Sequence, residues 1–285
     1  MKQLHLRHLD LFSGGGLFAL AARWAGIETV AFSEIEPYAN RVLAARFPGI
    51  RNLGNIQKLC CRTHECDYDP ESDDYLCPRC STPEWPVAFG DCQCIGADEY
   101  ADDFGFPDII TAGFPCQGAS VAGHGLGLDD PRTGLWYETL RVTRELRPRF
   151  LLLENVPGLR TRGADEILEG LAAADYAAEP FVVGARDVGA SHRRDRVWIV
   201  AYDTTFGIQG LRPARFEKSH ALAPPPLPLR RGDGQWEVEP DLRRAPHADP
   251  RWMDRLKVLG NAVTPHIPVL FFDFMRQTLN AQRHH

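Results

Sequence analysis

The sequence lacks any apolar run that approaches the roughly 20 residues of a membrane-spanning helix. Its first residues, Met1 to His5, lack the apolar core of a secretory signal peptide. No internal repeat is present either. We therefore expect a cytoplasmic protein that does not associate with membranes, and a chain of 285 residues has room for one large domain and a small one.

The sequence also lacks the positive net charge that is typical of proteins bound to nucleic acid, because its formal net charge is −6. The charges are unevenly distributed, with acidic residues concentrated at 65–108 and arginines later in the chain. The later arginines include Arg141, Arg144, Arg147, Arg149, Arg186, Arg193, Arg194, Arg196, Arg212, Arg215, Arg230, Arg231, Arg243 and Arg244. This distribution is compatible with a basic face directed at phosphates, and equally with arginines that are simply exposed to solvent. Charge alone does not decide between these two interpretations.

Cysteines are concentrated in one segment, since seven of the eight lie within 60–95. In a reducing compartment such a set indicates metal binding or catalysis rather than disulfides. Cys77-Pro78-Arg79-Cys80 has the spacing of a zinc knuckle. The expected zinc ligands are Cys61, Cys66, Cys77, Cys80, Cys92 and Cys94, with Cys60 and His64 as weaker candidates. Seven thiols exceed one four-cysteine site, so one or two structural zinc ions are expected, against the alternative of incidental free cysteines.

Apolar segments alternate between strand-like and helix-like patterns. The expected strands are 6–12, 29–33, 107–112, 150–153 and 196–201, and the expected helices are 17–25 and 37–47. A strand, helix, strand, helix order predicts an α/β fold with a mostly parallel sheet. Residues 204–250 are rich in proline and arginine and carry few regular signals, whereas 255–285 return to an apolar, helix-like pattern.

A cysteine follows directly after one of these expected strands. Residues 107–112 lead into Gly113-Phe114-Pro115-Cys116-Gln117, and this turn presents a thiol at the carboxyl edge of the sheet, where ligands of open α/β folds bind. Cysteine is the side chain best suited to attack carbon without a cofactor of its own. The pentapeptide resembles the nucleophile motif of the cytosine-5 DNA methyltransferases.

A glycine-rich turn, Asp10-Leu11-Phe12-Ser13-Gly14-Gly15-Gly16, separates the first strand from the first helix. By itself this turn suits either a nicotinamide dinucleotide or S-adenosylmethionine. Together with Glu34, the turn resembles the S-adenosylmethionine motif of the family, and Gly260-Asn261-Ala262-Val263-Thr264-Pro265 resembles the element that completes its cofactor pocket. The resemblance implies cofactor contacts from Phe12, Ser13, Gly14, Gly16, Leu17, Glu34, Ile35, Asn55, Phe114, Pro115, Asn261 and Val263. Asn55 stands where the family usually has an aspartate, which leaves the contact with adenine open.

Four residues are expected to carry the chemistry. The resemblance implies that Cys116 adds to carbon 6 of cytosine, that Glu154 is the acid at ring nitrogen 3, and that Arg194 contacts the flipped base. Arg196 is expected to anchor Glu154 or the backbone. His192, Arg194 and Arg196 are spaced by two, which would place them on one face of a strand, and His192 replaces the family's glutamine.

The resemblance implies a Rossmann-like class I methyltransferase core with a small DNA-recognition domain and a zinc insert. We expect residues 1–203 to form the S-adenosylmethionine-binding core with the insert at 60–95, residues 204–254 to be a short target-recognition region, and 255–285 to complete the core. Residues 120–133, with three alternating glycines, are a candidate lid over the DNA.

The expected function is methyl transfer from S-adenosylmethionine to carbon 5 of cytosine in double-stranded DNA, by a monomer in a bacterial or phage-infected cell. A cognate restriction enzyme, solitary action and phage self-protection all predict the same motifs. Three alternatives stay open at this stage: the same chemistry on tRNA, a non-catalytic DNA-binding relative, and a modified pyrimidine as substrate.

Overall fold

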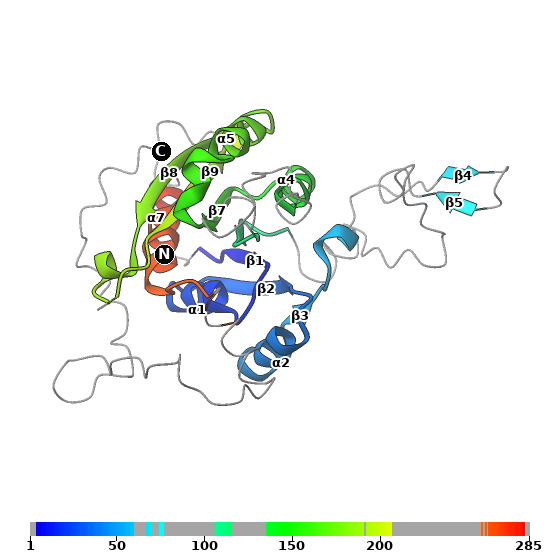
Figure 1. Ribbon diagram of the computed structural model, residues 1–285. Helices are drawn as coiled ribbons and strands as arrows, with labels where there is room; N and C mark the ends of the chain where they lie inside the picture. Colours follow the sequence, from blue (N-terminus) through cyan, green and yellow to red (C-terminus); the bar gives the residue numbers. More distant parts are fainter. Residues whose placement is uncertain are drawn as a thin grey trace.

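The computed structural model describes residues 4–59, 106–115, 135–190, 192–206, 258, 260 and 262–282, and the backbone alone at 67–69 and 74–76. Within these residues, helices cover both faces of a twisted seven-stranded sheet, and the last helix lies beside the first (Figure 1). Among the described residues, no helix has the length and apolar character needed to cross a membrane.

The sheet has the strand order β3-β2-β1-β6-β7-β9-β8. Its strands are β1 (Arg7–Leu11), β2 (Glu28–Ser33), β3 (Arg51–Asn52), β6 (Ile109–Ala112), β7 (Phe150–Asn155), β8 (Tyr176–Val183) and β9 (Arg196–Asp203). β9 pairs antiparallel with both of its neighbours, and all other pairs are parallel. Between β1 and β6 the strand order changes direction, and the carboxyl ends of the two strands therefore open a crevice, the usual ligand site of such sheets.

Each face of the sheet has its own apolar core because side chains alternate along every strand. Leu9, Ile110 and Leu151 face the cluster that contains α4 (Leu135–Leu146) and α5 (Ala164–Ala172). Ile109 and Leu152 face the opposite cluster, which contains α1 (Leu17–Trp24) and α7 (His266–Gln282). The central strands are buried on both faces, as expected for a parallel sheet between two helical layers.

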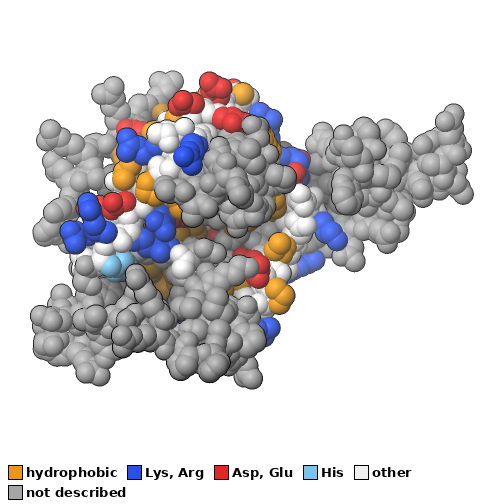
Figure 2. Space-filling view, viewed as in Figure 1, with side chains coloured by type: hydrophobic (Ala, Val, Ile, Leu, Met, Phe, Trp, Pro, Cys, Tyr) orange, Lys and Arg blue, Asp and Glu red, His pale blue; other side chains and the backbone are white. Residues whose placement is uncertain are grey.

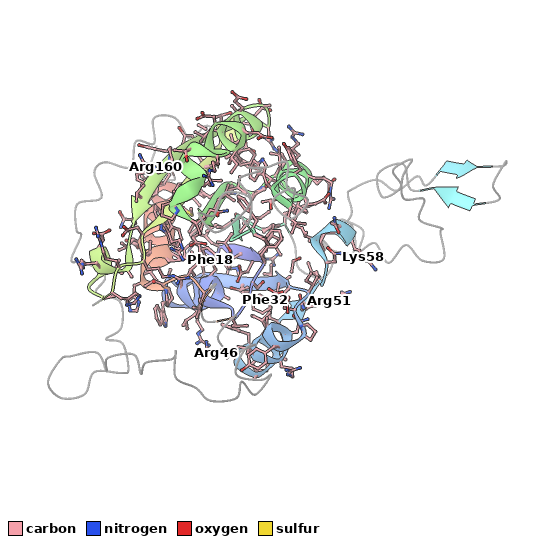
Figure 3. All side chains as sticks on the ribbon, in the orientation of Figure 1. Phe18, Phe32, Arg46, Arg51, Lys58 and Arg160 are labelled. Carbon is pink, nitrogen blue, oxygen red and sulfur yellow. The ribbon has the colours of Figure 1, made fainter. Side chains whose placement is uncertain are left out.

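A third, smaller cluster attaches α2 (Pro37–Arg46) to the sheet through Phe32, Leu43 and Phe47. Figure 3 shows Phe18 and Phe32 inside the fold, whereas Arg46 of α2 and Lys58, which follows β3, lie on its periphery. Short helices in the described part of the chain are η1 (Ile56–Lys58), η3 (Pro157–Thr161), η4 (Ala185–Val188) and η5 (Thr204–Phe206).

The expected α/β fold with a mostly parallel sheet is confirmed, and the expected strands and helices are present with ends that differ by one to a few residues. The sequence did not predict α4, α5 or β8. One expectation is wrong: β9 begins only at Arg196, so His192 and Arg194 precede the strand and do not share one face of it.

Most of the two expected accessory regions, 60–95 and 204–254, lies outside the described residues. Within the first, β4 (Asp67–Asp69) and β5 (Asp74–Leu76) pair antiparallel as a separate two-stranded sheet. Of the second, only residues 204–206 are described, as the short helix η5.

Candidate active site

A cavity of about 680 Å³ lies at the carboxyl ends of β1, β2, β6 and β7. Its wall is built from strand ends, from the glycine turn, from η1 and from the C-terminal segment before α7. The sequence-predicted residues that line it are Phe12, Ser13, Gly14, Leu17, Glu34, Ile35, Asn55, Phe114, Pro115, Glu154, Arg194, Arg196 and Val263. The fold therefore brings the expected cofactor residues and the expected acid and arginines to one place.

The glycine turn forms one end of this cavity. Its backbone is tightly bent, because Phe12 and Gly14 have positive φ angles of 54° and 53° and the Ser13 hydroxyl donates to the Asp10 carbonyl over 2.6 Å. A side chain as large as phenylalanine rarely adopts a left-handed backbone conformation, and such strain is typical of binding sites. The turn leads into α1, and the N-terminal end of a helix favours an anionic ligand group.

Gly16 belongs to the same turn but not to the cavity wall. It precedes α1 with a φ angle of 74°, and a Cβ atom there would lie 2.5 Å from Cε2 of Phe47 and 2.9 Å from Cδ2 of Leu43. The absence of a side chain at Gly16 therefore allows α1 and α2 to pack closely.

Glu34 follows β2 and binds the glycine turn directly. The N–H of Gly14 donates to Oε2 of Glu34 over 2.7 Å, and the N–H groups of Ile35 and Glu36 donate to Oε1 over 2.8 Å. The carboxylate thus fixes the turn relative to the end of β2. It also lines the cavity, where a carboxylate is suited to accept hydrogen bonds from ribose hydroxyls.

Asn55 lines the cavity, as does Ile35, whose side chain is exposed. The side-chain oxygen of Asn55 accepts from the N–H of Gln57 over 3.1 Å, so the residue caps η1. Its amide group also lies 3.3 Å from the side-chain oxygen of Gln57.

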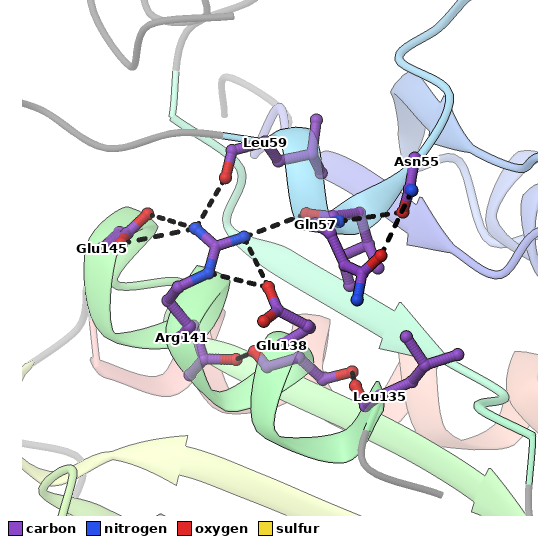
Figure 4. Close-up of polar contacts among 10 residues, drawn as sticks. Asn55, Gln57, Leu59, Leu135, Glu138, Arg141 and Glu145 are labelled. Carbon is purple, nitrogen blue, oxygen red and sulfur yellow. Dashed lines mark hydrogen bonds and ion pairs between the residues drawn. The ribbon is translucent and has the colours of Figure 1, made fainter. Parts of the chain in front are cut away.

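Arg141 of α4 holds η1 in place (Figure 4). One terminal nitrogen donates to the carbonyl of Leu59 over 2.6 Å and the other to the carbonyl of Ile56 over 2.9 Å. Glu138 and Glu145, one helical turn away on either side, form ion pairs with the same guanidinium. The sequence offered no signal for this role, because Arg141 was one of many arginines.

The loop after β6 forms the opposite wall. Phe114 is buried against Trp136, and its carbonyl accepts from the amide of Asn155 over 3.2 Å. The neighbouring strand β7 therefore holds the backbone that leads into Cys116. Cys116 itself lies outside the described residues, as do Gln117 and the expected lid at 120–133. The sequence analysis had given Asn155 no role.

Glu154 is a buried carboxyl group at the end of β7. Burial raises its pKa to about 7, although the guanidinium groups of Arg196 and Arg194 act in the opposite direction. The Nε atom of Arg196 lies 2.9 Å from Oε1 of Glu154, so the expected contact between the two is present. Oε2 faces the loop after β6, since a Cβ atom on Gly113 would lie 3.5 Å from it. A carboxyl group in this setting exchanges a proton near neutral pH.

Arg194 reaches the C-terminal segment from the stretch before β9. Its Nη2 atom donates to the carbonyls of Gly260 and Ala262, over 2.7 Å in each case. Its Nε atom is buried and has no hydrogen-bond partner among the described residues. Burial lowers the pKa of the Arg194 guanidinium, and Arg196 acts in the same direction.

A row of buried, hydrogen-bonded side chains on β1, β2 and β6 lies next to the glycine turn, and the sequence analysis did not identify it. Nδ1 of His8 lies 3.0 Å from the Thr29 hydroxyl, Nε2 lies 2.8 Å from the Thr111 hydroxyl, and that hydroxyl lies 2.9 Å from Oδ1 of Asp10. Burial raises the pKa of Asp10 to about 8, with Glu34 adding to the rise, and lowers that of His8 to about 3. In the sequence, the only sign of these hydrogen bonds is that polar residues alternate with apolar ones in the expected strands.

No group of three or more histidine, cysteine or acidic side chains suited to a metal ion occurs among the described residues. All of the expected zinc ligands, from Cys60 to Cys94, lie outside this part of the chain, and so does Asn261.

On the face shown in Figure 2, lysine and arginine side chains form separate groups with acidic side chains between them.

The strand order with a single antiparallel strand, combined with a glycine turn after β1, defines a Rossmann-like α/β methyltransferase core. Residues 67–227 match the family described as C-5 cytosine-specific DNA methylase. This chain therefore belongs to the C-5 cytosine-specific DNA methylase family.

Individual relatives support this assignment. Type II methyltransferase M1.ScrFI of Lactococcus lactis subsp. cremoris is 33% identical over 181 residues, which is 60% of this chain and 45% of that protein. Type II methyltransferase M.Eco47II of Escherichia coli is 30% identical over 217 residues, which is 74% and 43% of the two chains. The crystal structure of a candidate DNA modification methyltransferase encoded within an E. coli prophage has a TM-score of 0.50 and 25% identity, covering 71% of this chain and 48% of the other. The chain spans about half the length of the curated relatives it matches.

Proposed function

We propose that this chain is the catalytic core of an S-adenosylmethionine-dependent DNA (cytosine-5)-methyltransferase. One observation carries the proposal. A buried carboxyl group with a pKa of about 7, Glu154, lies beside the loop that leads directly into Cys116, in a cavity that also contains the glycine turn. An acid, a thiol-bearing loop and a ligand-binding turn in one cavity are what methyl transfer to a pyrimidine ring requires.

The residues of the cavity fit S-adenosylmethionine. A volume of about 680 Å³ is within the range of small-molecule sites, which hold ligands of a few hundred Å³. In the proposed arrangement, the backbone of Ser13 and Gly14 and the start of α1 hold the carboxylate of the ligand, and Glu34 accepts from its ribose. Phe12, Ile35 and Asn55 flank the adenine. When bound there, S-adenosylmethionine supplies an electrophilic methyl group.

The protein's own groups activate the cytosine ring, whose carbon 5 is otherwise a poor nucleophile. The Cys116 thiolate forms a bond to carbon 6 while Glu154 gives its proton to ring nitrogen 3, and carbon 5 gains the electron density of the resulting enamine. After methylation, water takes the proton from carbon 5 and the thiolate is expelled, and ring nitrogen 3 returns its proton to the Glu154 carboxylate, which restores both the ring and the acid. Glu154 serves this role because it is half protonated near pH 7.

The two arginines hold the acid and the base in this scheme. Arg196 fixes Glu154 through the 2.9 Å ion pair, and Arg194 is proposed to contact the flipped base. The charges of Arg194 and Arg196 both lower the pKa of Glu154, so the two guanidinium groups lie at the end of the cavity where the acid is.

The test is transfer of labelled methyl groups from S-adenosylmethionine to unmethylated duplex DNA or to tRNA, followed by nucleoside analysis. The proposal expects 5-methylcytosine in DNA, and expects Cys116→Ala to abolish transfer while cofactor binding persists. Label in tRNA alone would mean that the protein methylates RNA by the same chemistry. Cofactor binding without label in either nucleic acid would indicate a non-catalytic relative.

We further propose that residues 60–95 hold structural zinc and that 204–254 form a short target-recognition region. The cysteine spacing supports the first part, as does the pairing of Asp67 with Leu76, the residues next in sequence to Cys66 and Cys77. Metal analysis of the purified protein is expected to give one or two zinc ions per chain. Chelation should lower the melting temperature; unchanged folding and DNA affinity after metal removal would contradict a structural role.

A further inference from the structure

The C-terminal segment before α7 forms part of the cofactor end of the cavity although it is remote in sequence from the glycine turn. Val258, Gly260, Ala262 and Val263 all line the cavity. Val258 contacts the turn closely, since its Cγ1 atom would lie 3.2 Å from a Cβ atom placed on Gly15. The segment therefore lies directly on the turn that is proposed to hold the cofactor.

Val263 packs into the apolar core, and among the described residues the hydrogen bonds that reach 258–263 from elsewhere in the chain come from a single guanidinium group. Nη2 of Arg194 donates to the carbonyls of Gly260 and Ala262, each 2.7 Å away and 66 and 68 residues further along the chain. Hydrogen bonds from a charged donor are about twice as strong as those between neutral groups. The two carbonyls flank residue 261, so the bonds span the centre of the segment.

We propose that Arg194 is a positioning residue for the cofactor site, which holds residues 260–262 over the glycine turn whether or not DNA is bound. This inference rests on the proposed function, and it adds a role to the contact with the base. Arg194 then connects the two halves of the cavity, because its charge also acts on Glu154. A residue that served only the base would have no effect on cofactor affinity in the absence of DNA.

The decisive experiment measures the binding of S-adenosylhomocysteine by calorimetry without DNA. Arg194→Met keeps an unbranched apolar stem but removes the guanidinium and its donors, and it is expected to weaken binding about 10- to 100-fold, because part of the free energy of the two lost hydrogen bonds is transmitted to the cofactor site. Arg194→Lys is expected to bind within a few-fold of wild type, because one nitrogen serves both carbonyls and an ammonium group supplies three donors. Arg193→Ala changes the exposed neighbouring arginine and should bind as wild type does.

A second measurement does not depend on a ligand. Hydrogen exchange of the backbone amides in 260–266 should be faster in Arg194→Met than in wild type and in Arg194→Lys, in samples with normal circular dichroism. Equal cofactor affinity and equal exchange in Arg194→Met and wild type would overturn the inference. If wild type itself bound no cofactor, the proposed function would fail, and the exchange result would still show whether Arg194 holds the segment.

Discussion

Two buried carboxyl groups with raised pKa values, Glu154 and Asp10, lie at the carboxyl edge of the sheet. Their environments differ. Glu154 lines the cavity and contacts Arg196, whereas Asp10 is completely buried, contacts Thr111, and has one oxygen, Oδ2, without a hydrogen-bond partner among the described residues. The first group is therefore suited to proton transfer with a substrate, and the second affects the stability of the glycine turn.

Glu154 predicts the pH dependence of activity. The proposed reaction needs the protonated acid, so kcat/KM should decrease as pH rises through about 7, the pKa of Glu154 in the free protein. Glu154→Gln cannot donate this proton and should lose about 10² to 10⁴-fold in kcat without a change in cofactor affinity. Steady-state rates between pH 6 and 9 check both expectations. In Arg196→Gln, the loss of the guanidinium should raise the pKa of Glu154 further, so kcat/KM should decrease at a higher pH than in wild type. A decrease at the same pH in both proteins would argue against Glu154 as the titrating group.

Asp10 predicts how stability depends on pH. Its folded-state pKa of about 8 lies above the unfolded value, so the folded state binds the proton more tightly and stability is lost as pH rises towards and through 8. Between pH 6.5 and 8 the loss should be about 1 kcal/mol per pH unit. His8, with a folded-state pKa of about 3, is neutral in the folded protein but partly protonated in the unfolded chain near pH 6.5, so it offsets a small part of this loss at the lower end of the window. Chemical denaturation of Asp10→Asn should show a shallower slope than wild type, and equal slopes would contradict the prediction.

At the scale of elements, the cavity depends on contacts that fix short, irregular segments to the sheet. Glu34 fixes the glycine turn, Arg141 fixes η1, and Asn155 fixes the loop after β6. The regular helices and strands provide rigid attachment points, and these side chains set the positions of the loops between them.

Substitutions at Gly14 and Gly16 distinguish the cost of backbone strain from the cost of overpacking. Both have positive φ angles, but a Cβ atom on Gly14 would meet nothing within 4 Å, whereas one on Gly16 would clash with Phe47 and Leu43. Gly14→Ala should cost about 1 kcal/mol of stability from strain alone. Gly16→Ala should cost roughly 2–4 kcal/mol, because overpacking of the α1–α2 contact is added. Thermal and denaturant unfolding of both variants measures the difference, and equal losses would show that α2 moves freely to make room.

The Arg141 contact with η1 predicts an effect on cofactor binding. Without the guanidinium, the carbonyls of Ile56 and Leu59 lose their donor and η1, with Asn55, is no longer held against α4. Arg141→Ala should therefore raise KM for S-adenosylmethionine several-fold, with a smaller effect on kcat. Arg144→Ala, on the exposed side of the same helix, is the matched control and should leave both constants unchanged.

At the scale of the whole molecule, motifs at strand ends predicted the site because topology alone brings such ends together. The glycine turn, Glu34 and Glu154 each follow an apolar run, and an α/β order places all three at one edge. The roles of Arg141, Arg194 and Asn155 were not predictable, because each binds a backbone carbonyl remote in sequence. The strand position of Arg194 was wrong because a spacing of two does not reveal where a strand begins.

The pairing of the first helix with the last also has a consequence for the timing of folding during synthesis. α7 covers the same face of the sheet as α1, and Arg276 donates to the carbonyl of Ala25, 251 residues earlier. At roughly 5–20 residues per second, a ribosome needs on the order of 10–50 s to make this stretch. Throughout that interval the glycine turn exists without the segment that lies over it, so a nascent chain should acquire its ligand-binding competence in a single late event, after α7 has emerged.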